Sequence, residues 1–145
     1  MTKANEQAAR EAWRAMADLV LDNERRRDVS EQVGLSFGKI KALRRIANRP
    51  MPMRELASLL VVDPPNLTTV VDDLERAGLV ERQQHHPTDR RVKVVVATPE
   101  GAALAHRADE ILARPLAALS ALPRHELESL VRILARVYED QKPEH

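Results

Sequence analysis

A group of short polar side chains at helical spacing is the part of this sequence best suited to chemistry. It follows Asp63-Pro64-Pro65, in which the aspartate can cap a helix and a proline fits the first helical position, where a missing N–H costs nothing. The outward face of the predicted helix, residues 65–77, carries Pro65, Asn66, Thr68, Thr69, Asp72 and Arg76. Short donors and acceptors at the front of a helix can reach base edges where the backbone lies close to a DNA groove.

The residue types suggest how this face would divide its contacts. Pro65 can touch thymine methyl groups, and Asn66, Thr68 and Thr69 can bond base edges. Arg76 lies further along the helix and is better placed for a phosphate than for a base. Asp72 can either accept from the cytosine N4 amino group or orient an arginine, and the sequence leaves both roles open.

Two neighbouring helices would have to position this face. Apolar residues at helical spacing predict a short helix over residues 53–60, and Leu67, Val70, Val71 and Leu74 give the next helix its buried stripe. Gly78 can take the left-handed conformation that ends that helix. A short helix, a tight turn and a second helix with a polar face make a helix-turn-helix, although core helix pairs share the same apolar spacing.

A predicted β-hairpin follows this helix pair and favours the DNA-binding interpretation. Residues 79–83 and the valine-rich residues 91–97 have the pattern of strands, and residues 84–90 form a polar turn between them. Basic residues stand at the turn and at the start of the second strand, as in the wing of a winged helix-turn-helix. The candidate wing residues are His86, Asp89, Arg90 and Arg91.

The flanking regions are predicted to be helical and to contain the dimer contacts. The first helix is expected from Asn5 to about Arg27, and the second, which precedes the helix pair, from the N-cap Ser36 to Asn48. After the hairpin, a fifth helix follows Thr98-Pro99 with a kink at Pro115, and a last one follows Pro123. The apolar surface of the first helix and of the last two exceeds what these three helices can bury alone, which indicates a partner subunit. The predicted fold is mainly α with a small β-hairpin, one domain over residues 1–145. Residues 36–98 form the winged helix-turn-helix lobe, and residues 5–30 and 99–141 the dimerisation helices.

Charge is distributed unevenly along the chain. The net charge is +1, but residues 36–98 hold 11 basic and 7 acidic residues, whereas the flanks hold 12 basic and 15 acidic ones. The predicted lobe therefore carries +4 and the flanks −3. This distribution fits a phosphate-facing middle region.

Composition argues against several other functions. The chain has no cysteine, so it has no disulfide, thiolate metal ligand or thiol sensor. Its four glycines form no phosphate-binding loop, and we find no paired-carboxylate or nucleophile motif, so an enzyme is not expected. No apolar run approaches a membrane span and no export signal is visible, so we expect a cytoplasmic protein without cofactor or metal.

In four stretches the sequence resembles the MarR family of winged-helix transcriptional regulators. Met53–Ala57 and Leu67–Arg82 resemble that family's helix-turn-helix and first strand. Thr88-Asp89-Arg90-Arg91 resembles its Asp-x-Arg wing, and Thr98–Gly101 the Thr-x-x-Gly start of its next helix. These pieces occur in the family's order and at its spacing, and the likeness spans nearly the whole chain.

The resemblance implies a homodimer held by the first and last two helices. Its recognition helices would lie in successive major grooves of a pseudo-palindromic operator, about 10 base pairs apart, with the wings in the minor groove. Arg91 corresponds to the family's minor-groove arginine, Asp89 to the residue that orients it, and Arg90 would add a phosphate contact.

The resemblance also implies a repressor that a small, often aromatic and anionic, effector releases from DNA. Trp13, Met16 and Phe37 are candidates for such a pocket, although ordinary core positions explain them more simply. Two alternatives stay open, a winged-helix module that binds only proteins and a metal-responsive regulator using His85 and His86. The Arg25-Arg26-Arg27 run is assigned to neither DNA nor effector, because cations at the end of a helix have a local role there.

Overall fold

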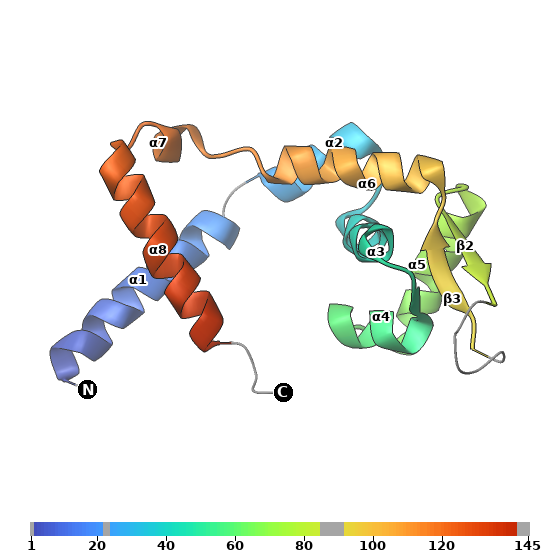
Figure 1. Cartoon of the computed structure of the whole chain (residues 1–145), viewed down its shortest axis with the longest axis horizontal. Helices are drawn as coiled ribbons and strands as arrows, with labels where there is room; N and C mark the ends of the chain where they lie inside the picture. The colour runs from blue at the N-terminus through green and yellow to red at the C-terminus, as the bar shows by residue number, and fades with distance from the viewer. Residues whose placement is uncertain (1, 22–23, 85–91, 142–145) are drawn as a thin grey trace. The chain divides into compact units, whose positions relative to one another are not determined.

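The computed structural model describes residues 2–21, 24–84 and 92–141 in two compact units, Met1–Leu112 and Ala113–His145 (Figure 1). The first unit contains α1 (Lys3–Leu21), α2 (Arg25–Val33), α3 (Phe37–Asn48), β1 (Met51–Pro52), α4 (Met53–Leu60), α5 (Pro64–Arg76), β2 (Val80–Gln83), β3 (Val94–Ala97) and α6 (Pro99–Leu112). The second contains α7 (Ala117–Ser120) and α8 (Arg124–Asp140). The prediction of a mainly helical chain with a small sheet is confirmed. No helix among the described residues is long and apolar enough to cross a membrane.

The start of α3 follows from its caps. Gly34 takes a left-handed conformation with φ of 73° and its N–H donates to the Ser30 carbonyl, which ends α2. Ser36 then caps α3, because its hydroxyl oxygen accepts from the backbone N–H of Lys39 at 3.3 Å. The boundary at Ser36 agrees with the sequence prediction.

The first predicted helix is wrong in its extent. The structure ends α1 at Leu21 and begins α2 at Arg25, where the sequence predicted one helix to about Arg27. Asp22 and Asn23, which lie outside the described residues, are poor helix formers because their side chains compete for backbone hydrogen bonds. The arginine run therefore begins a helix instead of ending one.

Arg25 nevertheless stabilises a helix C-terminus, that of α6. Its guanidinium donates to the carbonyl of Leu112 at 2.9 Å and lies 3.5 Å from that of Ile111. A cation at the last carbonyls of a helix satisfies unpaired acceptors and opposes the negative end of the helix dipole. The run thus has the local structural role that its charge suggested, but on a helix far away in the sequence.

One apolar core holds the helix-turn-helix together. Leu43 and Ile46 of α3, Leu56 of α4, and Leu67 and Leu74 of α5 are almost completely buried in it. Burying each such side chain contributes about 1.5 to 3 kcal/mol relative to exposing it. Because α3 packs against α4, α5 and α6, it fixes the orientation of α5.

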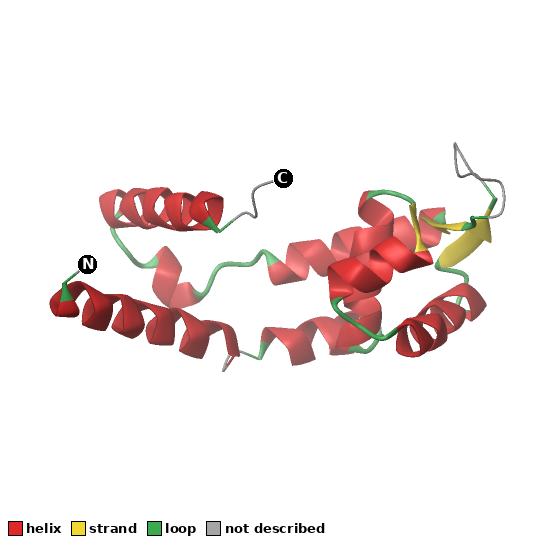
Figure 2. Cartoon of the chain, turned by 90° about the horizontal axis from the view of Figure 1, so that it is seen from below, coloured by secondary structure: helices red, strands yellow, loops and turns green. Residues whose placement is uncertain are grey.

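The sheet has one more strand than predicted. Its order is β1-β3-β2, and β1 pairs with β3 through Met51↔Val95 and Pro52↔Val94. Figure 2 shows the strands together at one end of the first unit. A two-residue strand has no periodicity to detect, and Pro52 is tolerated because β1 is an edge strand.

The fifth predicted helix ends earlier than expected. α6 stops at Leu112 instead of continuing through a kink at Pro115. A proline excludes the helical conformation at the residue before it, so helices commonly end ahead of it. In the second unit, α8 begins at Arg124, directly after Pro123, as predicted.

Val61, in the turn between α4 and α5, has a strained backbone. It is the one non-glycine residue with positive φ in the described part of the chain, with φ of 53° and ψ of 51°. For a β-branched residue this conformation costs about 1 to 2 kcal/mol. Its side chain is 90% exposed, so no packing offsets the cost.

Replacing Val61 with glycine should therefore stabilise the protein. We expect Val61→Gly to raise the free energy of unfolding by about 1 kcal/mol, the released strain less the added entropy of the unfolded chain. Urea unfolding followed by circular dichroism measures this change. Val62→Gly is the matched control and should be destabilising, because Val62 has no positive φ. Equal effects of the two changes would contradict strain at Val61.

Candidate nucleic-acid interface

The buried stripe of α5 turns its polar face outward. Leu67, Val71 and Leu74 are at most 1% exposed, so the opposite side of the helix faces solvent. The structure exposes Pro65, Asn66, Thr68, Thr69 and Arg76 and leaves Asp72 half-buried. The chain thus places all six predicted residues of this helix on its accessible side.

Four of the six residues lie in one row. Pro65, Thr69, Asp72 and Arg76 follow one another at steps of four, three and four residues, which is the repeat of a helix face. Asn66 and Thr68 flank the row on opposite sides. The side chains at the front of the face, near Pro65, are therefore short and uncharged, and those at its back, near Arg76, are charged.

The front of α5 begins with two prolines instead of a side-chain cap. Asp63 occupies the N-cap position, as predicted, but its carboxylate makes no capping hydrogen bond. The reason is that Pro64 and Pro65 have no N–H to donate, which leaves only the Asn66 N–H in range. Thr68 donates its hydroxyl proton to the Pro64 carbonyl at 3.0 Å, and Thr69 donates to that of Pro65 at 3.3 Å.

Arg82 of β2 joins the back of α5 to the sheet. Its guanidinium donates to the Asp72 carboxylate at 2.7 Å and to the Glu75 carboxylate at 3.1 Å, and its backbone N–H donates to Glu75 at 3.2 Å. Of the two roles the sequence left open for Asp72, the structure shows the pairing with an arginine.

Sequence reasoning did not single out Arg82, although a signal was present. Val80 is buried, and in a strand the residue two positions later lies on the same face. An arginine on the inward face of a strand beside an acidic helix end indicates an ion pair. The side chain of Arg82 is indeed only 22% exposed.

Asp73 holds two further cations. Its carboxylate pairs with Lys39 of α3 at 3.3 Å and with Arg76 at 3.0 Å. Arg76 is therefore tied to its own helix in the free protein, although its side chain is 76% exposed. The predicted phosphate contact by Arg76 requires this exposed pair to open, which costs little.

The start of α4 is joined to the end of α3 by an ion pair of Arg49 and Glu55. The hydrogen bond and charge of Arg49 hold the pKa of Glu55 below its ordinary value. Glu55 also lies in the first turn of α4, where a negative charge favours the helix dipole. This pair fixes the helix that precedes the turn.

The predicted wing residues lie outside the described residues. The strands on either side, β2 and β3, are antiparallel and pair in the register Val80↔Ala97 to Gln83↔Val94. His86, Asp89, Arg90 and Arg91 all fall within residues 85–91, and their roles stay predictions.

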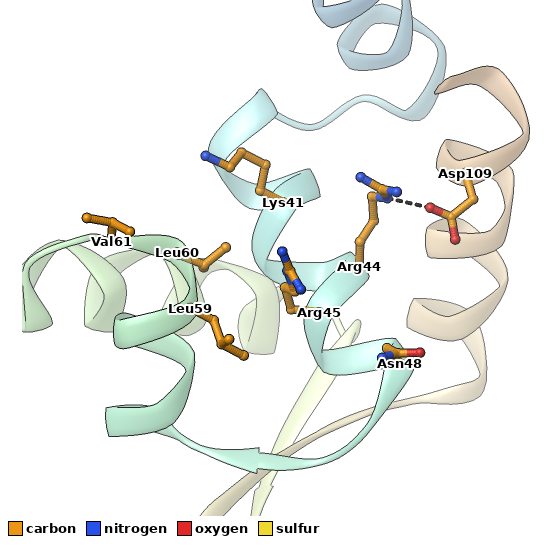
Figure 3. Close-up of a pocket in the computed structure, with 8 residues that line it drawn as sticks. All are labelled: Lys41, Arg44, Arg45, Asn48, Leu59, Leu60, Val61 and Asp109. Atoms are coloured by element: carbon orange, nitrogen blue, oxygen red, sulfur yellow. Dashed lines mark hydrogen bonds and ion pairs between the residues drawn. The ribbon is translucent and has the colours of Figure 1, made fainter. Parts of the chain in front are cut away.

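A basic hollow lies on another side of the lobe, between α3 and α4 (Figure 3). It has a volume of about 590 Å³ and combines cations with an apolar wall. Its lining consists of Lys41, Arg44, Arg45 and Asn48 of α3, Leu59, Leu60 and Val61, and Asp109 of α6. Arg44 bonds Asp109, whereas Lys41 and Arg45 have no ion pair among the described residues.

The three residues suggested for an effector pocket lie elsewhere. Phe37 is half-buried, packs beside Val29 and Ile40, and has the Arg26 guanidinium 5.0 Å from its ring centre. Trp13 is 68% exposed on α1, where Met16 is half-buried. None of the three lines the basic hollow in the described part of the chain, and their role stays a prediction.

Among the residues that the structure describes, no three histidine, aspartate or glutamate side chains gather as metal ligands would. His85 and His86 lie outside that part of the chain. The metal-responsive alternative is therefore untested at the residues that suggested it.

A helix pair whose second helix exposes a short polar face, followed directly by an antiparallel sheet, defines a winged helix-turn-helix protein. The sequence profile of the MarR family matches residues 35–93, which include α3, both helices of the pair, β1 and β2. A candidate transcriptional regulatory protein for the hcr operon of Thauera aromatica is 32% identical over 114 residues, covering 77% of this chain and 68% of that protein. The chain belongs to the MarR family.

Solved structures agree with this assignment. The transcriptional regulator BldR from Sulfolobus solfataricus is 29% identical, with a TM-score of 0.64 over 94% of this chain and 99% of that one. NadR in complex with 4-hydroxyphenylacetate is 26% identical, with a TM-score of 0.60 over 93% of this chain and 90% of that one. The predicted family and fold are confirmed, and the protein is a transcriptional regulator.

Proposed function

We propose that the protein is a homodimeric repressor that binds a pseudo-palindromic DNA operator and is released by a small anionic effector. The observation that carries the proposal is the exposed short polar face of α5, held over its buried stripe, in a chain of the MarR family. Residues 36–98 would contact DNA, with α5 in the major groove and the wing in the minor groove. Such a repressor binds the cell's DNA in the cytoplasm, and this function requires neither catalysis nor a cofactor.

Exposed apolar faces on the terminal helices support the homodimer. No residue of α1 or α8 is buried, yet both helices carry apolar residues at helical spacing. Trp13 and Leu21 of α1 are each 68% exposed, and Val131 and Val137 of α8 are 68% and 48% exposed. Apolar faces of this extent are covered in a stable protein. We assign this role to residues 5–30 and 99–141, as in the sequence prediction.

Salt-dependent binding to DNA tests the proposed function. The purified full chain is titrated with a promoter fragment from its own gene neighbourhood and with scrambled DNA of equal length, at several salt concentrations. We expect tighter binding to the promoter fragment, an affinity that falls steeply with salt, and a dimer by light scattering. Equal, weak binding to both fragments would favour a protein-interaction module instead.

The basic hollow of Figure 3 is the site that we propose for the effector. Lys41 and Arg45, which have no ion pair among the residues that the structure describes, offer positive charge, and Leu59 to Val61 offer an apolar wall. Together these features suit a small aromatic carboxylate. 4-Hydroxyphenylacetate, the ligand in the NadR structure, has this chemistry. The site differs from the pocket that the sequence suggested around Trp13, Met16 and Phe37.

Removing one cation from this hollow should weaken the binding of the effector. We expect Arg45→Met to raise the concentration of an aromatic carboxylate needed for release from DNA by roughly 10-fold or more, because a charge-assisted hydrogen bond is lost. Arg45→Lys is the matched control, since it keeps the charge. Fluorescence anisotropy of labelled DNA, with a panel of carboxylates including 4-hydroxyphenylacetate, measures release. If Arg45→Met needs the same carboxylate concentration for release from DNA as the original protein, the effector does not bind in this hollow.

A further inference from the structure

The front of α5 has almost no hydrogen-bond donors to offer a base. The hydroxyl protons of Thr68 and Thr69 are already donated to the carbonyls of Pro64 and Pro65, at 3.0 and 3.3 Å. Both hydroxyl oxygens can still accept, and both methyl groups are available for apolar contact. The side-chain amide of Asn66, which is exposed, remains as both a donor and an acceptor.

The cations around this helix face are held by carboxylates. Arg76 is the only cation within α5, and it pairs with Asp73, which also holds Lys39. Arg82 pairs with Asp72 and Glu75. Lys39, Arg76 and Arg82 are thus each paired with a carboxylate in the free protein, and an ion pair would have to open before any of them could bond a base.

A mainly apolar hollow of about 480 Å³ lies beside the front of α5. Thr68 and Pro64 form its α5 side, and its other apolar walls come from Met53, Ala57, Val62 and Leu67. Arg54 of α4 stands at its rim. The first helix of a helix-turn-helix crosses the DNA backbone, so Arg54 is placed for a phosphate.

These features match one base pair better than the other. In the major groove guanine offers two acceptors, N7 and O6, whereas the Asn66 amide, the one group on the front of α5 that still offers a donor, presents that donor beside an acceptor. Adenine offers an acceptor and a donor side by side, and an asparagine amide can bond both at once through its N–H and its oxygen. Thymine offers a methyl group. A face with one amide, exposed methyl groups and an apolar hollow is complementary to adenine and thymine.

We infer that α5 selects A·T base pairs, with Asn66 bonding adenine and Thr68 and Pro65 contacting thymine methyl groups beside the apolar hollow. This inference rests on the proposed function, because it requires α5 to lie in the major groove. It specifies the operator: each half-site has an A·T-rich core where α5 contacts it, and the two cores lie about 10 base pairs apart.

Selection from a random duplex library, followed by base analogues, tests the inference. The full chain selects sites from a library of random double-stranded DNA, and the selected duplex is then made with uracil in place of thymine at one position at a time. Uracil lacks only the methyl group. We expect A·T-rich cores, and about a fourfold loss of affinity at each contacted thymine, which corresponds to one buried methyl group.

Two substitutions of Thr68 separate its methyl group from its hydroxyl. Thr68→Val keeps a methyl group at the contact and should keep the sensitivity to uracil. Thr68→Ser keeps the hydroxyl, removes the methyl group, and should abolish that sensitivity at one position per half-site. Asn66→Ala should relax the choice of adenine at its base pair by roughly 5- to 150-fold. Circular dichroism confirms that each variant is folded.

The outcomes distinguish this inference from the proposed function. Selected sites with guanine in their cores, or cores that bind equally with uracil, would overturn the A·T inference and leave a DNA-binding regulator. A library that yields no preferred sequence would overturn both. If the Thr68→Ser variant is still sensitive to uracil at every contacted thymine, Thr68 does not contact a thymine methyl group, and that part of the inference is wrong.

Discussion

Gly101→Ala is expected to destabilise the protein by about 3 kcal/mol or more. A Cβ atom on Gly101 would lie 1.9 Å from the Leu79 carbonyl oxygen and 2.8 Å from its carbon. Ordinary contacts of a Cβ atom begin near 3.4 Å, so the two backbone segments would have to separate by about 1.5 Å. Neither neighbour is a flexible side-chain end that could move away cheaply.

Hydrogen bonds explain why these backbones cannot separate easily. Thr98 donates its hydroxyl proton to the Gly78 carbonyl at 2.7 Å, and its hydroxyl oxygen accepts from the Gly101 N–H at 3.1 Å. The Thr98 N–H donates to the Leu79 carbonyl at 3.0 Å. One threonine thus caps α6 and binds it to the turn that ends α5. A larger residue at 101 would strain all three bonds.

Gly38→Ala provides a matched control for this measurement. Gly38 is helical like Gly101, but it is exposed, and a Cβ atom there meets nothing within 4 Å. We expect this change to stabilise the protein by roughly 0.5 to 1 kcal/mol, the difference in helix propensity. Urea titration of both variants compares them directly. If Gly101→Ala were as harmless as Gly38→Ala, the close approach at Leu79 would be contradicted.

The helix boundaries were predictable because their causes are local. Ser36, Gly78 and Pro123 each act on residues within one turn of themselves, and the elements that they limit begin or end as expected. The outward face of α5 follows from its own buried stripe. Spacing in the sequence therefore contains the information that sets these features.

The interactions that were missed join residues far apart or leave no pattern. Arg25 bonds a carbonyl 87 positions away, and a sequence does not show which helix end an arginine will reach. The strand at Met51 is too short for periodicity and forms because β3 lies beside it. The basic hollow needs α3 and α4 packed together before its cations share a space. Tertiary packing determines all three.

The second large effect concerns Arg82 and DNA affinity. Arg82 neutralises two carboxylates, those of Asp72 and Glu75, on the helix that would enter the major groove. We expect Arg82→Met to weaken operator binding at least about tenfold at low salt, because two uncompensated negative charges would then face the DNA phosphates. The loss should shrink as salt rises, since salt screens repulsion between exposed charges.

A further pair of substitutions separates charge from structure in this prediction. If Arg82 acts by neutralising its partners, Asp72→Asn with Glu75→Gln in the Arg82→Met background should restore affinity to within about threefold of the original protein, because neutral amides do not repel phosphates. If Arg82 only holds β2 against α5, the amides cannot replace it and affinity stays low. Thermal unfolding of each variant shows how much stability the ion pairs contribute.

Arg124→Met is the matched control for Arg82→Met. Arg124 also pairs with a glutamate, Glu128, at 2.8 Å, but on α8 and with a side chain that is 92% exposed. It should change operator affinity less than twofold, because the pair belongs to residues outside 36–98 and an exposed ion pair adds little to stability. If Arg124→Met weakened operator binding as much as Arg82→Met, the loss would come from the lower net charge of the protein and not from the place of Arg82. A loss confined to Arg82, and reversed by the two amides, would identify the carboxylates of α5 as the groups whose charge must be masked before DNA can bind.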